Sequence, residues 1–295
     1  ALMQFLENEF LRVAINEFGA ELTSIVRKSD QSEYVWNADP AFWGKHAPLL
    51  FPIIGRLKDQ EYTLDGTTYE ITRHGFARDK EFTVVQASDT CVELSLSADA
   101  YTKAMYPYDF TFTIRYSLDG KTLKKEHIVQ NDSNHTMYYE IGGHDAYMLS
   151  FDDAALSDYY LEFEGIDALD VIDCDADVML MQSHHAVPLK DGRLYLSRET
   201  FSKDNTLMLD RLPVHRCTLG CLSHSQKVIM EFPEIDYFAV WSPYKPDCDV
   251  PFICLEPWST LPDCAYLGKE LEKKVGIRTV AAGRSETLSF RVTIE

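Results

Sequence analysis

Hydrophobic and polar residues alternate with a period of two along several segments of the chain. The run 110–118, FTFTIRYSL, places every second residue on an apolar face, and the runs 92–97 and 288–295 repeat this pattern. Because successive side chains of a strand point to opposite faces of its sheet, such segments bury one face and expose the other. The pattern predicts half-buried antiparallel strands.

Turn signals separate these runs, and helical signals are sparse. Asp65-Gly66 and Asp119-Gly120 predict hairpin turns, because Asp and Gly accept positive φ. A short surface helix is expected at 269–274, KELEKK, closed by Gly276. No linker divides the chain, so residues 1–295 are expected to form one domain. Many short strands and few helices favour an all-β fold, a large antiparallel β-sandwich or a barrel.

Charge and cysteine content narrow the classes of function. The 28 Lys and Arg against 47 Asp and Glu give a net charge of −19, which argues against nucleic acid as a partner and disfavours anionic membranes. The seven cysteines include no CxxC pair, so no zinc ribbon or thioredoxin motif is indicated, and a reduced cytoplasmic compartment fits best. No secretory signal and no run near the roughly 20 apolar residues of a membrane span is present. The oligomeric state cannot be inferred from the sequence.

Basic residues stand beside apolar ones in two segments. Arg56 follows the apolar run 48–55, so we expect it at the end of a buried strand; a surface arginine or salt-bridge partner is the alternative. In RHGFARD, Arg73 and Arg78 flank His74. The two arginines can hold sugar hydroxyls, or a phosphate by bidentate contacts, and solvated charges are the alternative. Taken alone, His74 also fits a structural histidine.

A glycine pair precedes a second histidine. Gly142 and Gly143 predict a bulge or a close backbone approach just before His144. Either feature would turn the imidazole out of a strand into a cleft. A capped or buried histidine is the alternative.

Two acids end apolar runs. Glu256 lies between the run 252–255 and Pro257-Trp258, which predicts a partly desolvated carboxyl with a raised pKa, as suits a general base. Trp258 can form an apolar wall or a stacking face for a sugar, or belong to the core. Asp210, in LMLD, can accept hydrogen bonds from sugar hydroxyls or cap a turn.

These residue types match the chemistry of exchanging the anomers of a hexose. A base removes the proton of the C1 hydroxyl while an acid protonates the ring oxygen, the C1–O5 bond breaks, and the ring closes on the other face of the aldehyde. One carboxylate and one or two imidazoles are sufficient, each positioned proton transfer contributing about 10²–10⁴ in rate, and no cofactor is required. Glu256, His144 and His74 supply these groups.

The sequence resembles the aldose 1-epimerase, or galactose mutarotase-like, family, and more narrowly the bacterial branch with LacX-type proteins and hexose-6-phosphate epimerases. The matching elements cover nearly the full length: the opening LRVAINEFGAELTSI, HGFARD at 74–79, YPYDF at 106–110, GGHDAY at 142–147, LMLD at 207–210 and LEPW at 255–258. The resemblance implies a galactose mutarotase-like β-supersandwich and a small-molecule hexose or hexose phosphate as substrate.

The resemblance also implies roles for individual residues. Glu256 would be the base, His144 the acid, and His74 would assist at the ring oxygen. Arg56 and Asp210 would contact sugar hydroxyls. In the phosphate-specific branch, the position of Arg78 helps to hold the phosphate.

Two departures from the family pattern bear on these roles. The family usually has His-Pro where this chain has His144-Asp145, and proline stiffens the backbone beside the acid. The phosphate-specific branch commonly has Gln where this chain has Arg73.

These departures leave alternatives to a free-hexose epimerase. A hexose-6-phosphate 1-epimerase is suggested by Arg73 and Arg78, and a non-catalytic sugar-binding or sensing protein by Asp145. Histidine and glutamate are also zinc ligands, but no HExxH motif is present and we expect no metal. His184-His185 is expected in a loop rather than as a ligand pair.

Overall fold

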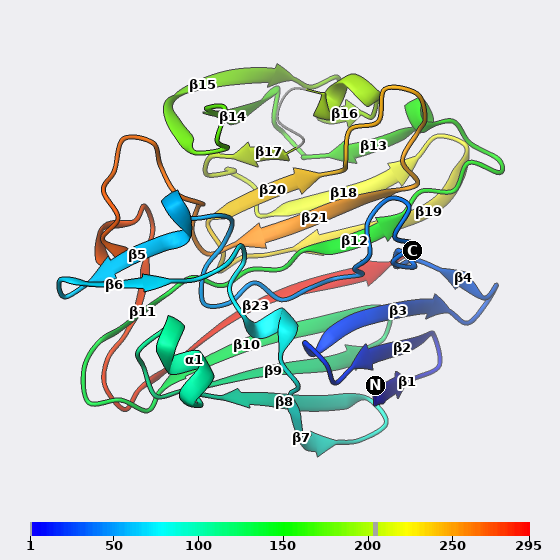
Figure 1. Ribbon diagram of the computed structural model, residues 1–295. Coiled ribbons are helices and arrows are strands. Elements are labelled where there is room, and N and C mark those ends of the chain that lie inside the picture. Colours follow the sequence, from blue (N-terminus) through cyan, green and yellow to red (C-terminus); the bar gives the residue numbers. More distant parts are fainter. Residues whose placement is uncertain (1, 203–205) are drawn as a thin grey trace.

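The computed structural model describes residues 2–202 and 206–295, which form β-sheets with little helix (Figure 1). A nine-stranded sheet contains, in spatial order, β16 (Arg193–Tyr195), β13 (Tyr159–Glu162), β18 (Arg216–Cys221), β19 (His224–Glu231), β23 (Ser285–Ile294), β10 (Thr122–Asn131), β9 (Phe110–Asp119), β8 (Cys91–Ser97) and β7 (Thr83–Ala87). A six-stranded sheet contains β12 (Asp145–Met148), β21 (Phe252–Trp258), β20 (Tyr237–Trp241), β17 (Thr206–Leu209), β14 (Ala168–Cys174) and β15 (Leu180–Pro188).

Smaller sheets flank these two. One contains β1 (Met3–Glu7), β2 (Leu11–Asn16), β3 (Glu21–Arg27) and β4 (Ser32–Glu33); the others pair β5 (Glu61–Leu64) with β6 (Thr67–Glu70) and β11 (Met137–Tyr139) with β22 (Arg278–Val280). The helical elements are α1 (Ala100–Met105) and the 3₁₀ turns Lys58–Gln60, Ala77–Asp79, Leu156–Asp158, Arg198–Phe201 and Leu271–Lys273. None of the helices in the described residues is long and apolar enough to cross a membrane.

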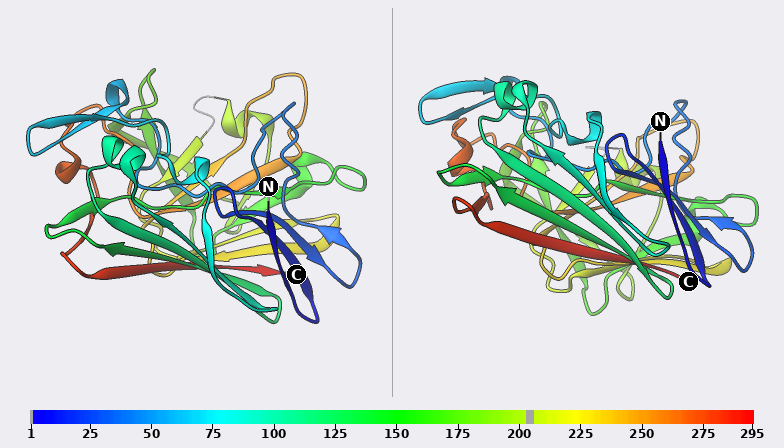
Figure 2. Two further views of the ribbon diagram at one scale, coloured as in Figure 1. Left: turned by 60° about the horizontal axis from the view of Figure 1, so that its bottom comes forward. Right: turned by 90° about the horizontal axis from the view of Figure 1, so that it is seen from below.

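The large sheets pack face to face, as the period-two pattern predicts for an antiparallel β-sandwich. In β9 every second residue is buried, from Phe110 to Leu118, and faces the interior. β21 is buried along its whole length, because its inner face meets the core and its outer face is covered by loops. The nine-stranded sheet is the lower layer in Figure 2, and the loops, with the β5–β6 hairpin, gather above the six-stranded sheet. The outer face of that sheet is therefore the floor of a loop-walled region.

Both predicted hairpins are present. Leu64 pairs with Thr67 across Asp65 and Gly66, which both have positive φ, and Asp119 pairs with Thr122. The helix predicted at 269–274 is wrong: only Leu271–Lys273 forms a 3₁₀ turn. The α-helix at Ala100–Met105, capped reciprocally by Asp99 and Thr102, was not anticipated, because six residues are too few for a helical period to show.

Two further expectations from the sequence are wrong. The apolar run before Arg56 is irregular rather than a strand: Leu50 bridges Gly142 and Phe51 bridges Gly75, so its backbone groups pair with two separate segments. The pair 184–185 lies in β15 rather than in a loop. The Nδ1 atom of each histidine is hydrogen-bonded to an aspartate of β14, His184 to Asp170 and His185 to Asp173.

Candidate active site

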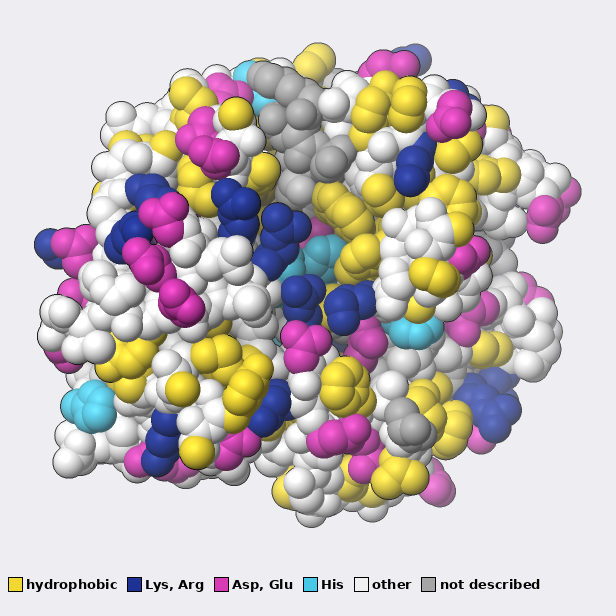
Figure 3. Space-filling model, viewed as in Figure 1, with side chains coloured by type: hydrophobic (Ala, Val, Ile, Leu, Met, Phe, Trp, Pro, Cys, Tyr) yellow, Lys and Arg dark blue, Asp and Glu magenta, His cyan; other side chains and the backbone are white. Residues whose placement is uncertain are grey.

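A cleft of about 430 Å³ opens over the outer face of the six-stranded sheet. It brings together seven of the eight residues selected from the sequence. Its lining comprises Trp43, Gly55, Arg56, Arg73, His74, Arg78, His144, Val178, Thr206, Met208, Trp241, Glu256, Trp258 and Pro262. Figure 3 shows the hollow at the centre of this face, with basic side chains gathered around histidine. The volume falls within the range of small-molecule sites.

Glu256 and His144 are in contact at the bottom of the cleft. β12 and β21 are neighbours, and the pairing of Asp145 with Leu255 places His144 beside Glu256. His144 Nε2 lies 3.3 Å from Glu256 Oε1, and the two side chains are 9% and 1% exposed. The local sequence explains the burial of Glu256, since it continues the apolar strand β21.

Burial shifts the proton affinities of this pair in opposite directions. It raises the pKa of Glu256 well above the ordinary value, against the opposing effect of the Trp258 indole N–H, because the charged carboxylate is desolvated. It lowers the pKa of His144 to about 3, because the imidazolium is desolvated, and the charge of Arg78 adds to this. Both groups are therefore most stable uncharged, Glu256 as a protonated carboxyl and His144 as a neutral imidazole.

The glycines before His144 permit a close approach, as predicted. A Cβ on Gly142 would lie 2.8 Å from Cδ1 of Trp258, and a Cβ on Gly143 would lie 2.8 Å from Cζ of Phe290. The backbone of this segment is thus held between the cleft wall and the core, which fixes where His144 leaves the strand.

Aromatic side chains that sequence reasoning missed hold the imidazole of His144. Trp43 stacks on it with ring centroids 4.8 Å apart, and Trp241 meets it edge-on at 5.5 Å. Trp43 comes from a loop with no periodic pattern, so no local signal linked it to His144. Trp241 ends β20, directly opposite Cys254 of β21.

His74 lies beside His144 and is fixed by hydrogen bonds with the backbone of Gly55. Its Nδ1 accepts a hydrogen bond from Gly55 N at 2.9 Å, so the neutral ring carries its proton on Nε2. Its ring centroid lies 5.5 Å from that of His144. Burial, with the charges of Arg78 and Arg73, lowers the pKa of His74 well below its usual value, so the ring stays a neutral donor.

Three arginines form a basic mouth on an otherwise acidic protein. Arg56, Arg73 and Arg78 all line the cleft. Arg78 Nη2 donates to the carbonyl oxygen of Arg73 at 3.0 Å, while its buried Nε has no partner among the described residues. A half-buried guanidinium with a free N–H is a ready partner for an anionic or hydroxyl oxygen.

Asp210 is the predicted site residue that does not line the cleft. It follows β17, whose residues Thr206 and Met208 do line it, and the strand period places Asp210 next on the same face. Its carboxylate lies beside Asp170 and His184, with ligand atoms of the three within 4.8 Å of one another.

Asp145, where the family usually has proline, points away from the cleft. Its Oδ2 accepts from Lys125 Nζ at 2.7 Å and from Tyr147 OH at 2.9 Å. Lys125 and Asp145 are both buried in the sandwich interior. The residue after His144 is thus anchored by an ion pair.

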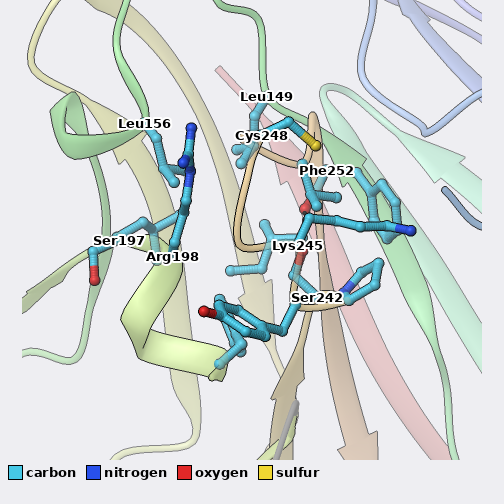
Figure 4. A pocket seen from close by; sticks show the side chains of 14 residues that line it. Leu149, Leu156, Ser197, Arg198, Ser242, Lys245, Cys248 and Phe252 are labelled. Atoms are coloured by element: carbon cyan, nitrogen blue, oxygen red, sulfur yellow. Dashed lines mark hydrogen bonds between the residues drawn. The ribbon is translucent and has the colours of Figure 1, made fainter. Parts of the chain in front are cut away.

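Figure 4 shows a second cavity, bordered by Leu149, Arg198, Lys245 and Cys248 among others. Its volume of about 20 Å³ is close to that of one water molecule and too small for a hexose. The cleft is therefore the better candidate for a sugar site.

Comparison with known proteins agrees with the fold. The model of the family described as aldose 1-epimerase matches residues 3–276. The protein LacX (plasmid) of Lactococcus lactis subsp. lactis is 32% identical, with 98% of each chain covered. The structure of a galactose mutarotase related enzyme from Lactobacillus acidophilus superposes with a TM-score of 0.94 at 30% identity, covering 100% of this chain and 97% of the other. A galactose mutarotase-like protein from Lactobacillus casei ATCC 334 gives a TM-score of 0.91 at 30% identity, with 100% of both chains covered. The chain therefore belongs to the aldose 1-epimerase family and is an isomerase of the mutarotase type.

Proposed function

We propose that Glu256 and His144 exchange the anomers of a hexose by passing one shared proton between base and acid forms. The observation that carries this proposal is the 3.3 Å contact between Glu256 Oε1 and His144 Nε2 in a cleft of sugar size. The opposite pKa shifts of the two groups support it.

The protons balance within the pair. In the reactive form Glu256 is a carboxylate and His144 an imidazolium. Glu256 removes the proton of the C1 hydroxyl and His144 donates its proton to the ring oxygen, so the C1–O5 bond breaks and the aldehyde forms. Both protein groups are then neutral, which is the arrangement that burial favours. Closure on the other face of the aldehyde reverses both transfers, and no net proton or cofactor is consumed.

Other lining residues position the sugar. His74 is a neutral Nε2–H donor close to His144, suited to the ring-oxygen region. Trp258 supplies an apolar wall, and Arg56 contacts hydroxyls from the mouth. Asp210, next on the face that carries Met208, is proposed to accept a hydroxyl hydrogen bond at that end of the cleft.

The role of Glu256 is tested with freshly dissolved α-glucose and α-galactose. Polarimetry measures the mutarotation rate above background for the wild type, for Glu256→Gln and for the control Glu126→Gln, an acid outside the cleft. We expect Glu256→Gln to lose about 10²–10⁴ in rate, and the control to keep the wild-type rate. Equal rates above background in wild type and Glu256→Gln would remove Glu256 as the base.

A hexose 6-phosphate is the second candidate substrate, favoured by the unpartnered Nε of Arg78 and by Arg73 beside it. The test compares kcat/KM for glucose and glucose 6-phosphate in wild type, Arg78→Met and the exposed control Arg284→Met. If the phosphate binds here, Arg78→Met lowers the ratio of phosphorylated to free sugar about 10–100-fold, the equivalent of one charged hydrogen bond of about 1.5–3 kcal/mol. An unchanged ratio, or no wild-type rate with glucose 6-phosphate, rejects this candidate.

A further inference from the structure

Beneath the cleft, next to the catalytic pair, lies a buried thiol that the anomer exchange does not use. Cys254 stands two residues before Glu256 on β21, so both side chains lie on the same face of the strand. A ligand atom each from His144, Cys254 and Glu256 lie within 4.8 Å of one another, and all three residues are buried. The catalytic pair is therefore part of a three-residue cluster.

The cluster has the donor set of a borderline-soft divalent metal ion. Thiolate, imidazole and carboxylate bind Zn²⁺ at about 2.0–2.3 Å, and three protein ligands leave a fourth position open. A tetrahedral ion of this size holds its ligand atoms roughly 3.3–3.8 Å apart. The contact between His144 and Glu256, at 3.3 Å, already fits this spacing.

A second observation points to a missing ligand at this place. Glu256 Oε1, the atom that faces His144 Nε2, is buried without a hydrogen-bond partner in the described residues. Buried polar atoms without partners are uncommon in folded proteins, and a bound ion is one of the ligands that satisfies them. Both residues line the cleft, so an ion can enter from solvent on that side.

We propose that His144, Cys254 and Glu256 bind a thiophilic divalent cation such as Zn²⁺ or Cd²⁺, and that this ion inhibits the enzyme. On binding, the Cys254 thiol and the Glu256 carboxyl each release a proton to solvent, and a metal–sulfur and a metal–oxygen bond form. The ion occupies the lone pairs that Glu256 and His144 need for proton transfer. The binding follows from the cluster alone, whereas the inhibition rests on the proposed function.

Another cluster, formed by Asp170, His184 and Asp210, cannot produce the metal–thiolate signal that the experiment below measures. It contains no sulfur, it is largely exposed, and His184 Nδ1 is already hydrogen-bonded to Asp170 Oδ1 at 2.8 Å. Carboxylate-rich sites of this kind favour harder ions. Metal bound there gives no thiolate signal.

The experiment titrates the purified full-length protein with Cd²⁺ and records the near-ultraviolet charge-transfer absorbance of a cadmium–thiolate bond. We expect a band that saturates near one equivalent in the wild type. Cys254→Ser should lose the band and bind Cd²⁺ at least about tenfold more weakly, since even partners outside the ligand shell change affinity 10–100-fold. The control Cys264→Ser, also buried but outside the cluster, should keep the band.

Glu256→Gln gives an independent check if Cys254→Ser fails to fold. It retains the thiol and should bind Cd²⁺ at least about tenfold more weakly. Absence of a band in the wild type, or a band of full intensity in Cys254→Ser, overturns the proposed site.

Activity separates this proposal from the proposed function. In the wild type the mutarotation rate should fall in proportion to the band, and excess chelator should restore it. A saturated band with an undiminished rate would overturn the inhibition and the roles of Glu256 and His144, while the metal site itself would stand. A protein that is inactive with every hexose but shows the band would refute only the proposed function.

Discussion

Removal of Lys125 leaves the carboxylate of Asp145 in the interior of the sandwich without its cation. The pair is 2.7 Å apart with side chains 0% and 1% exposed, so neither charge can reach solvent without disrupting the core. Burial lowers the pKa of Lys125, with Asp145 opposing the shift, and the Phe290 ring lies 5.0 Å from Nζ. Breaking a buried pair by removal of one partner costs about 3–5 kcal/mol.

The expected size in a melting experiment follows from chain length. At about 2.1 cal/mol/K per residue, the 295-residue chain has an unfolding entropy near 0.6 kcal/mol/K. Lys125→Met should therefore lower Tm by about 5–8 °C, and Asp145→Asn by a similar amount. The double variant removes both charges and should lie within about 2 kcal/mol of the wild type, because replacing both partners of a buried pair is often nearly neutral.

Differential scanning calorimetry on the four proteins measures this cycle. The matched control is Lys124→Met, the neighbour on β10 whose side chain is 34% exposed and pairs loosely with Glu126 at 3.7 Å. The control should change the free energy of unfolding by less than about 1 kcal/mol. A Lys125→Met protein as stable as the control, or a double variant that shows the sum of both single losses, would refute the reasoning.

Further expected outcomes concern the site. The pH profile of kcat/KM, corrected for background, should stay level from about pH 3 up to the raised pKa of Glu256. Below this range the His144 imidazole becomes protonated, and above it the Glu256 carboxyl loses its proton. A rate limited by a group titrating near pH 6.5 would contradict this. Gly75→Ala should lower the free energy of unfolding in urea more than Gly66→Ala does. Both glycines have positive φ, which costs alanine about 1–2 kcal/mol. Only the added Cβ at position 75 meets backbone, 2.3 Å from Phe51 O, and this clash adds about 1–3 kcal/mol. Equal losses of stability in the two variants would show that the backbone around Phe51 shifts at no cost, and would contradict this prediction.

Much of the fold follows from local pattern. Strand alternation predicted β8, β9 and β23, and turn chemistry predicted the hairpins at Asp65-Gly66 and Asp119-Gly120. The run before Arg56 was misread, because a continuous apolar segment has the same pattern whether it pairs in a ladder or bridges two separate loops.

Some features of the site likewise follow from local sequence, and others depend on tertiary packing. The burial of Glu256 was visible in its own segment, since an acid interrupts an apolar strand. The contact of Trp43 with His144 had no local signal, because it depends on how a loop folds over the sheet. Lys125 lies on the buried face of β10, but its pairing with Asp145 depends on how two distant strands pack and has no signal in either segment.

The most direct test of the shared-proton mechanism is the additivity of Glu256→Gln and His144→Asn. Anomer exchange of glucose, measured by NMR magnetisation transfer for the wild type, both single variants and the double variant, gives four rates. If the two groups act as one unit, each single variant loses about 10²–10⁴ and the double variant is no slower than the worse single. Losses that multiply in the double variant would show that Glu256 and His144 act independently, and would contradict the mechanism.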